Sequence, residues 1–239
     1  MEFYFIRHAQ SENNLLYDTT GASDGRSQDP ELTEAGRRQA EILARFLGRS
    51  DPAAMVRRPD PQNIAGFGIT HLYTSLMVRA VATGAIIARA LKVPLVAWED
   101  LHETGGIYLD DEPTGKRIGQ PGRNRAYFET HYPDLVLPAT LGEAGWWNRP
   151  FEEREQRPAR AERFLRELLA RHGGKEDHVA VVSHGGFYNV LLRAVFKIER
   201  EDCWFGLNNA AITRLDFDAD GVALDYVNRL DFMPKDWVT

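Results

Sequence analysis

Short apolar runs bounded by polar or turn-forming residues predict the strands of this chain. The first run, residues 2–6, is aromatic and β-branched and lacks Gly and Pro, which is typical of a buried strand. Residues 179–182 are continuously apolar, as expected for a strand buried on both faces of a parallel sheet. The other predicted strands are residues 69–74, 93–98, 211–217 and 222–227, and the last two are joined by a hairpin turn at 218–221.

Between these strands, apolar residues at helical spacing predict helices with one buried face. One helix begins near Thr33, a suitable N-cap, and ends at Gly48. Two others run from about Ser75 to Leu91 and from Pro158 to Gly173, and a fourth follows Gly186. The alternation predicts a single-domain α/β fold over residues 1–239, a three-layer α/β/α sandwich around a mostly parallel sheet of about six strands.

Two long stretches interrupt this alternation. Residues 49–68 contain several prolines and no period, and we interpret them as an excursion at the surface. Residues 108–157 are the least regular part of the chain, and we interpret them as an inserted lid over the active site, with one short helix near 125–131. The polar stretch from Arg7 to Asn14 also shows no apolar period and is expected to be a loop, and residues 18–30 are expected to be irregular.

Composition narrows the class of protein. A formal charge of −6 argues against a nucleic-acid partner, although a local cluster of cations could still bind an anionic substrate. One cysteine, Cys203, fits a reducing, cytoplasmic location. No basic segment followed by an apolar stretch begins the chain, and no apolar run approaches the ~20 residues of a membrane span, so we expect neither a secretory signal nor membrane insertion. A homodimer is kept as a candidate assembly.

Anion-binding residues follow three of the predicted strands. Arg7 and His8 follow the first strand, Arg79 lies in the first turn of the helix after the second, and His184 and Gly185 follow residues 179–182. Because such corners open on one edge of an α/β sheet, we expect these groups to converge. Arginine and histidine hold phosphoryl oxygens by charge-assisted hydrogen bonds, and glycine lets a helix N-terminus approach them. Each corner alone could be a solvated strand end; their recurrence predicts a phosphate site.

Five stretches together carry a family resemblance: residues 7–14, 32–39, 74–83, 101–103 and 183–186. They are similar to the Arg-His opening with its later Asn, the first helix, the second-arginine segment, the acid segment and the second histidine of the histidine phosphatase superfamily. That family includes cofactor-dependent phosphoglycerate mutases and many phosphatases. The resemblance spans nearly the whole chain except residues 49–68 and 108–157.

What the resemblance implies is covalent phosphoryl transfer through a phosphohistidine, and we expect no cofactor. His8 would be the nucleophile. Arg7, Arg79, His184 and the backbone N–H of Gly185 would hold the equatorial oxygens, and Asn14 would add a hydrogen bond. Glu103 would protonate the leaving group and then activate water. Glu99, Asp100 and Glu12 are the alternatives for this acid, and Glu103 is preferred because it holds the motif position.

The remaining histidines are expected to be surface or supporting groups, and no metal is expected, because none of them has the spacing of metal ligands: His71, His102, His131, His172 and His178.

Departures from the mutase pattern favour a phosphatase that acts on a small phosphorylated metabolite. Ala9 replaces the usual Gly, Gln10 replaces an acid common in mutases, and residues 103–108 differ from the Glu-Arg-His-Tyr-Gly segment of the mutases. The alternatives are a 2,3-bisphosphoglycerate-dependent phosphoglycerate mutase and a non-catalytic phospholigand-binding protein. A mutase would need further cations around the mouth, for which the insert offers Arg117, Arg123, Arg125 and Arg149. Trp146 and Trp147 either cover the substrate or pin the insert to the body.

Overall fold

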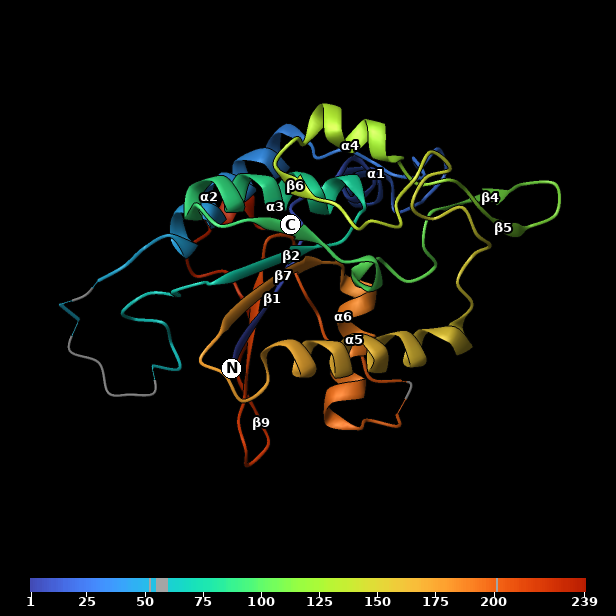
Figure 1. Cartoon of the computed structure of the whole chain (residues 1–239). Coiled ribbons are helices and arrows are strands. Elements are labelled where there is room, and N and C mark those ends of the chain that lie inside the picture. The colour runs from blue at the N-terminus through green and yellow to red at the C-terminus, as the bar shows by residue number, and fades with distance from the viewer. Residues whose placement is uncertain (52, 55–59, 201) are drawn as a thin grey trace.

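One large sheet forms the centre of the molecule (Figure 1). The structure is a computed structural model, and it describes residues 1–51, 53–54, 60–200 and 202–239. In this part of the chain seven strands pair in the order β6-β3-β2-β7-β1-β8-β9. Neighbours from β6 to β1 are parallel, whereas β8 and β9 are antiparallel. The strand bounds are β1 Glu2–Arg7, β2 His71–Thr74, β3 Leu95–Ala97, β6 Leu135–Val136, β7 His178–Ser183, β8 Ile212–Phe217 and β9 Val222–Arg229.

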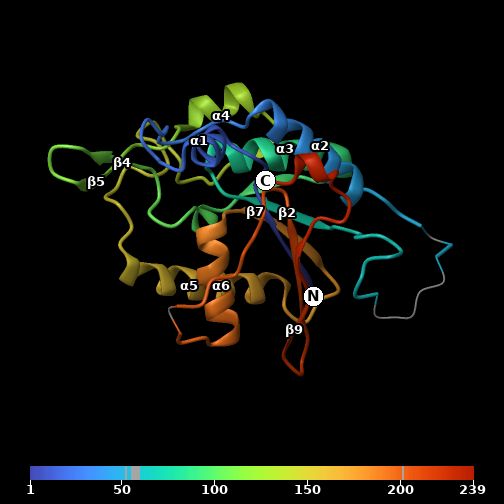
Figure 2. The ribbon, with the colours of Figure 1, turned by 180° about the vertical axis from the view of Figure 1, so that it is seen from behind.

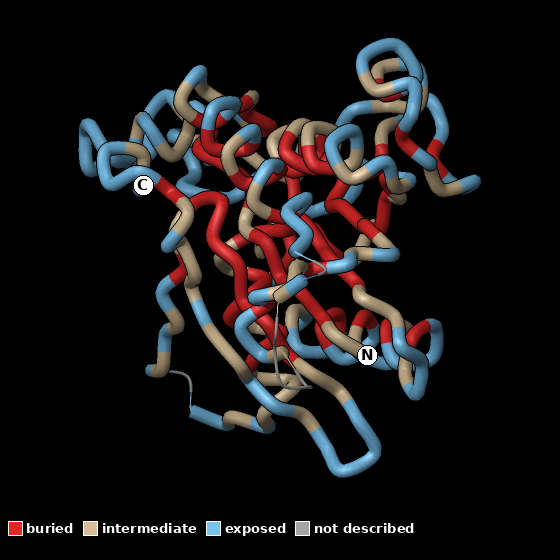
Figure 3. The backbone as a smooth tube through the Cα atoms, turned by 90° about the vertical axis from the view of Figure 1, so that its left-hand side faces the viewer, coloured by how far each residue is buried: buried red, intermediate tan, exposed pale blue. Residues whose placement is uncertain are grey.

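Helices cover both faces of the sheet and give the three predicted layers. Figures 1 and 2 show α2 and α3 on one face and α5 and α6 on the other. Each pair buries its own apolar cluster against the sheet, and Figure 3 shows the buried backbone concentrated along the strands between them. The helix bounds are α1 Glu12–Thr20, α2 Glu34–Leu47, α3 Val78–Leu91, α4 Arg125–His131, α5 Arg157–His172 and α6 Gly185–Phe196. The structure thus confirms the α/β fold class.

The expected loop at residues 7–14 is wrong in its second half, because α1 begins at Glu12. Ser11 and Asn14 form a reciprocal capping box that starts this helix. None of its residues is fully buried, so it shows no apolar stripe that a periodicity argument could detect.

The insert at residues 108–157 holds more regular structure than the sequence indicates. Its helix α4 lies at Arg125–His131, as predicted. The same segment also contains β4 (Tyr108–Asp111) and β5 (Lys116–Gly119), which pair as a hairpin apart from the main sheet, and β6 at the edge of that sheet. These strands are only two to four residues long, too short for a reliable apolar pattern.

Residues 52 and 55–59 of the predicted surface excursion lie outside the described residues. Three single turns of 3₁₀-helix complete the described elements: Glu99–Leu101, Arg154–Gln156 and Lys235–Trp237.

Candidate active site

The three predicted corners meet at the carboxyl edge of the sheet. Arg7 ends β1 and pairs in register with Ser183, which ends β7, so His8 and His184 follow on adjacent strands. The His8 amide donates to the Ser183 carbonyl at 2.9 Å, and the two imidazole centroids are 5.0 Å apart. Arg79 reaches the same place from the first turn of α3. The crossover connections of a parallel sheet therefore bring together residues that are about 175 positions apart in the chain.

His8 is held as a neutral imidazole with one defined tautomer. Its Nδ1 lies 2.7 Å from the carbonyl oxygen of Ala9, and Arg79 Nε donates to its Nε2 at 3.1 Å. A carbonyl only accepts, so Nδ1 carries the proton and the Nε2 lone pair points into the site. Burial, followed by the charges of Arg79 and Arg7, lowers the pKa of His8 well below its usual value. A neutral, oriented nitrogen is what nucleophilic attack requires.

Arg7 and Arg79 place two buried guanidinium groups beside His8. Arg7 Nη1 donates to the Leu207 carbonyl, and its buried Nε has no hydrogen-bond partner among the described residues. Arg79 Nη1 lies 3.9 Å from Asp29 Oδ1. A buried guanidinium with N–H groups left unpaired is suited to an anion that completes its hydrogen bonds.

His184 is completely buried at the N-cap of α6, and a serine orients its ring. Its Nε2 lies 3.0 Å from Ser75 Oγ, which itself accepts a hydrogen bond from the Met77 amide at 3.1 Å. The other ring nitrogen, Nδ1, is buried without a partner in the described structure. Burial, then the charge of Arg79, lowers the pKa of His184 well below its usual value. The helix predicted to begin at about Ser75 begins instead at Val78, and the Ser75 hydroxyl contacts His184.

Glu103 lies against the first turn of α6, beside His184. Its Oε2 accepts from the Gly186 amide at 3.1 Å, and its Oε1 accepts from the Phe187 amide at 3.0 Å. A Cβ at position 186 would approach Oε1 to 2.3 Å, so glycine is required for this close contact. The alternative acid Asp100 is engaged differently, in an ion pair with Arg163 at 2.6 Å. The N-terminal turn of α6 therefore holds the Glu103 carboxylate at the carboxyl edge of the sheet, where His8 and His184 also lie.

Asn14 and Gly185 complete the predicted set. The Oδ1 of Asn14 accepts from the Ser11 amide at 3.1 Å and from Asn209 Nδ2 at 3.2 Å, so this oxygen is used to build the loop. Asn209 Nδ2 also donates to the His8 carbonyl at 3.0 Å. Gly185 is the first residue of α6, and a Cβ there would meet only the Arg7 guanidinium, at 3.8 Å or more.

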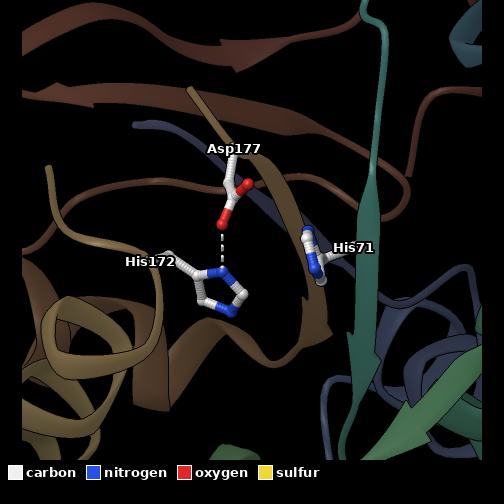
Figure 4. Close-up of side chains that lie close together, drawn as sticks. All are labelled: His71, His172 and Asp177. Carbon is white, nitrogen blue, oxygen red and sulfur yellow. Dashed lines mark hydrogen bonds and ion pairs between the residues drawn. The ribbon is translucent and has the colours of Figure 1, made fainter. Parts of the chain in front are cut away.

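A second group of histidines lies at the opposite, amino edge of the sheet. His71, His172 and Asp177 place their potential ligand atoms within 4.8 Å of one another (Figure 4). His172 Nδ1 lies 2.9 Å from Asp177 Oδ2, and its Nε2 lies 2.9 Å from the Tyr73 hydroxyl. Because both ring nitrogens are already bonded, we assign His172 to joining the end of α5 to β2 and to the residue before β7 rather than to holding an ion.

The two tryptophans of the insert pack against the body. Trp146 and Trp147 are both buried, and their rings lie 5.9 and 4.7 Å from that of His102. A Cβ at Gly106, whose φ is +76°, would overlap the Trp147 indole. These contacts account for both indoles as packing that fixes the insert beside the acid segment.

The four insert arginines are held in different ways. Arg117 pairs with Asp110 at 3.7 Å and Arg125 with Glu129 at 3.2 Å. Arg123 lies over the Tyr127 ring at 4.6 Å, and Arg149 lies over the Trp147 ring at 4.1 Å. Two of these four cations, Arg117 and Arg125, are thus already paired with acids of the insert.

The sequence did not indicate the roles of Ser75, Asn209 and Asp29, which contact His184, His8 and Arg79 respectively. Their contacts join positions far apart in the chain, 109 residues for Ser75 and His184 and 201 for Asn209 and His8. Short polar residues in loops are too common to be singled out by type or spacing. They could have been predicted by placing each loop at the carboxyl edge of the predicted sheet and listing the polar residues that the loops contain.

The chain belongs to the histidine phosphatase superfamily, branch 1, whose family model matches residues 3–57 and 61–230. A comparison with curated protein sequences gives no significant match. None of the described helices has the length and apolar character needed to cross a membrane.

Solved structures share the fold over nearly their whole length. The mycobacterial glucosyl-3-phosphoglycerate phosphatase is 22% identical with a TM-score of 0.59, covering 96% of this chain and 99% of that one. Phosphoserine phosphatase from Entamoeba histolytica is 19% identical with a TM-score of 0.58, at 98% and 99% coverage. A putative α-ribazole-5′-phosphate phosphatase from Escherichia coli is 17% identical with a TM-score of 0.61, at 96% coverage of both. At these identities the likeness establishes the fold.

Proposed function

We propose that the protein is a phosphomonoesterase that hydrolyses a small phosphorylated metabolite through a phosphohistidine on His8. The observation that carries this proposal is the state of His8: a buried, neutral imidazole whose Nε2 accepts a hydrogen bond from Arg79, with the charge of Arg7 acting on it and the His184 ring 5.0 Å away. Structural neighbours named as phosphatases for three different small phosphate esters support the same class of activity.

In the first step His8 Nε2 attacks phosphorus in line with the leaving oxygen. The N–P bond forms as the P–O bond breaks, and Glu103 gives its proton to the departing alkoxide. Arg7, Arg79, the Nδ1–H of His184 and the Gly185 amide bind the three equatorial oxygens, with Asn14 at the rim. The incoming phosphoryl group takes the place of the Arg79 N–H as the partner of His8 Nε2.

In the second step water attacks the phosphohistidine. Glu103, now a carboxylate, accepts the proton of the attacking water, the P–N bond breaks, and neutral His8 and inorganic phosphate are regenerated. The insert at residues 108–157 acts in this proposal as a cover that shapes the space for the alcohol part of the substrate. No metal ion takes part, and a cytoplasmic location and a homodimer remain predictions from the sequence.

Hydrolysis of p-nitrophenyl phosphate in excess EDTA tests the proposal. The variants are His8→Ala and, as a matched control, His71→Ala, which removes a histidine from the opposite edge of the sheet. We expect turnover in EDTA that is lost in His8→Ala and kept in His71→Ala. Turnover that is equal in both variants would contradict the assignment of His8.

The mutase alternative has its own assay. Conversion of 3-phosphoglycerate to its 2-isomer only in the presence of 2,3-bisphosphoglycerate, without release of phosphate, would replace the phosphatase proposal. Saturable phosphate binding by a well-folded protein that performs neither reaction would instead favour the binding-only alternative.

A further inference from the structure

Asp29 is a buried carboxylate that the reaction described above does not use. It lies 5% exposed in the segment between α1 and α2, a part of the chain in which sequence patterns indicate no structure. Asn13 fixes this segment to α1, with its Nδ2 2.7 Å from the Ser27 carbonyl and its Oδ1 2.9 Å from the Ser27 amide. Asp29 is thereby presented to the beginning of α3.

The first contact of Asp29 is with the N-terminus of that helix. Its Oδ1 accepts a hydrogen bond from the Val78 amide at 3.0 Å. In the described structure Met77, the N-cap residue, makes no side-chain cap of its own. Asp29 therefore caps α3 from 49 residues away, and Arg79 stands in the same turn.

The second contact is with Arg79 itself. The same Oδ1 lies 3.9 Å from Arg79 Nη1, and the two side chains are 4% and 11% exposed. Arg79 is thus held at two points, by Asp29 at Nη1 and by His8 Nε2 at Nε, 3.1 Å away. One ion pair and one hydrogen bond thus engage two different nitrogens of the guanidinium before any substrate arrives.

The negative charge of Asp29 needs an explanation beyond capping. Its other oxygen, Oδ2, is buried and has no hydrogen-bond partner among the described residues. Burial raises the pKa of Asp29 to about 6, although the Arg79 charge, the Val78 amide and the Arg123 charge oppose this and the charge of Glu31 adds to it. Asparagine caps a helix about as well as aspartate and carries no charge to desolvate. A carboxylate at this position is explained by what it does to Arg79.

We propose that Asp29 is a positioning residue, whose carboxylate aims the Arg79 guanidinium at the phosphoryl group held against His8. This inference rests on the proposed function, because it assigns Arg79 to phosphate. It predicts an unusual sign: removing a negative charge beside the anion site weakens anion binding. If the Asp29 carboxylate acted only through its electrostatic field, removing it would strengthen anion binding, because the site would become more positive.

Calorimetric titration with inorganic phosphate at about pH 7.5 tests the sign, using the full chain. Asp29→Asn keeps an acceptor for Val78 and loses the charge, and we expect its affinity to fall about tenfold through misplacement of Arg79. The matched control is Asp18→Asn, which removes an exposed acid of α1 whose charge acts on Arg7. We expect this control to bind phosphate as tightly as the wild type or more tightly.

A pH series separates positioning from a general structural defect. Sulfate is the probe, since its charge does not change between about pH 5 and about pH 8. Its affinity for the wild type should increase as Asp29 ionises on passing about pH 6 and should be flat in Asp29→Asn. Arg79, Arg123 and Glu31 are the charged groups facing Asp29, and all three are retained in both proteins.

The outcomes distinguish this inference from the proposed function. A wild type that binds phosphate, with Asp29→Asn binding equally or more tightly, would overturn the positioning role and leave the phosphatase proposal intact. A folded wild type that does not bind phosphate would overturn both. Weaker binding in Asp29→Asn together with unchanged or tighter binding in Asp18→Asn is the result that we expect.

Discussion

The hydroxyl of Ser75 fixes which nitrogen of His184 carries the proton. Ser75 Oγ accepts the Met77 amide at 3.1 Å, and His184 Nε2, 3.0 Å away, is the acceptor that the described residues offer to the hydroxyl hydrogen. With Nε2 accepting, the proton of the neutral ring resides on Nδ1, which is buried and has no partner within the described chain. A substrate oxygen placed between the two imidazoles would supply that partner.

Replacing Ser75 by Ala should therefore weaken substrate binding more than it weakens the fold. Loss of one neutral hydrogen bond costs about 1 kcal/mol, and the released tautomer should raise KM for p-nitrophenyl phosphate about fivefold to tenfold. Ser183→Ala is the matched control, since it removes a buried hydroxyl that donates to the Leu101 carbonyl at 2.7 Å. Steady-state kinetics and thermal unfolding of both variants are the measurements. Equal changes in KM would indicate that Ser75 has only a structural role.

Gly186→Ala should damage catalysis while leaving the helix intact. Alanine is a better helix former than glycine by about 1 kcal/mol, so α6 should not be destabilised. Its Cβ, however, would come within 2.3 Å of Glu103 Oε1 and 2.4 Å of Thr104 Oγ1, and the acid must move. We expect kcat to fall about 10-fold to 100-fold with an unchanged melting temperature. Gly206→Ala, where a Cβ meets nothing within 4 Å, is the control, and wild-type kcat in Gly186→Ala would argue against Glu103 as the acid.

Glu103→Gln separates the two roles of this side chain, as a hydrogen-bond acceptor at the start of α6 and as the proposed proton donor. The glutamine oxygen can still accept from Gly186 or Phe187, but the amide cannot transfer a proton to the leaving alkoxide. We expect kcat to fall about 100-fold or more with little change in the affinity for phosphate. The loss should be larger for an alkyl phosphate than for p-nitrophenyl phosphate, whose leaving group needs less protonation. An equal loss with both substrates would favour a purely structural role.

The fold class follows from apolar periodicity, and the phosphate site follows from polar residues placed after strands. Strands such as β1 and β7 and helices such as α2 can be predicted from the sequence because their buried residues follow a regular pattern. Helix α1 does not, because it buries no residue completely and depends on the Ser11 cap. The roles of Asp29 and Ser75 could not be predicted from the sequence for a related reason. The topology of the sheet determines their partners, and no local sequence pattern indicates a contact between residues 49 or 109 positions apart.

Stability should depend on pH in opposite directions for the two kinds of buried group. The raised pKa of Asp29, about 6, means that the folded state binds its proton more tightly than the unfolded state. The stability that this proton contributes is fully present below about pH 4 and is lost as the pH rises through about 6. For His8 and His184, whose pKa values are lowered, stability is instead lost as the pH falls below about 6.5.

Asp29→Asn isolates the carboxylate contribution. At about pH 7.5 the variant should be more stable than the wild type by about 2–3 kcal/mol, from a shift of about two pKa units at 1.36 kcal/mol each. The advantage should shrink to nothing near pH 3, where Asp29 is protonated in both the folded and the unfolded state. Urea unfolding at the two pH values measures it. A constant difference across the range would show that the charge of Asp29 has no unusual cost in the fold.

In the proposed mechanism His8 Nε2 carries the phosphoryl group during turnover. Phosphohistidine is stable in alkali, so the most direct measurement is mass spectrometry of the enzyme quenched with base during steady-state turnover of p-nitrophenyl phosphate. We expect one added phosphoryl group on the peptide that contains His8, and none in His8→Ala. Active enzyme that carries no phosphoryl group at any quench time, or carries it on a residue other than His8, would contradict it.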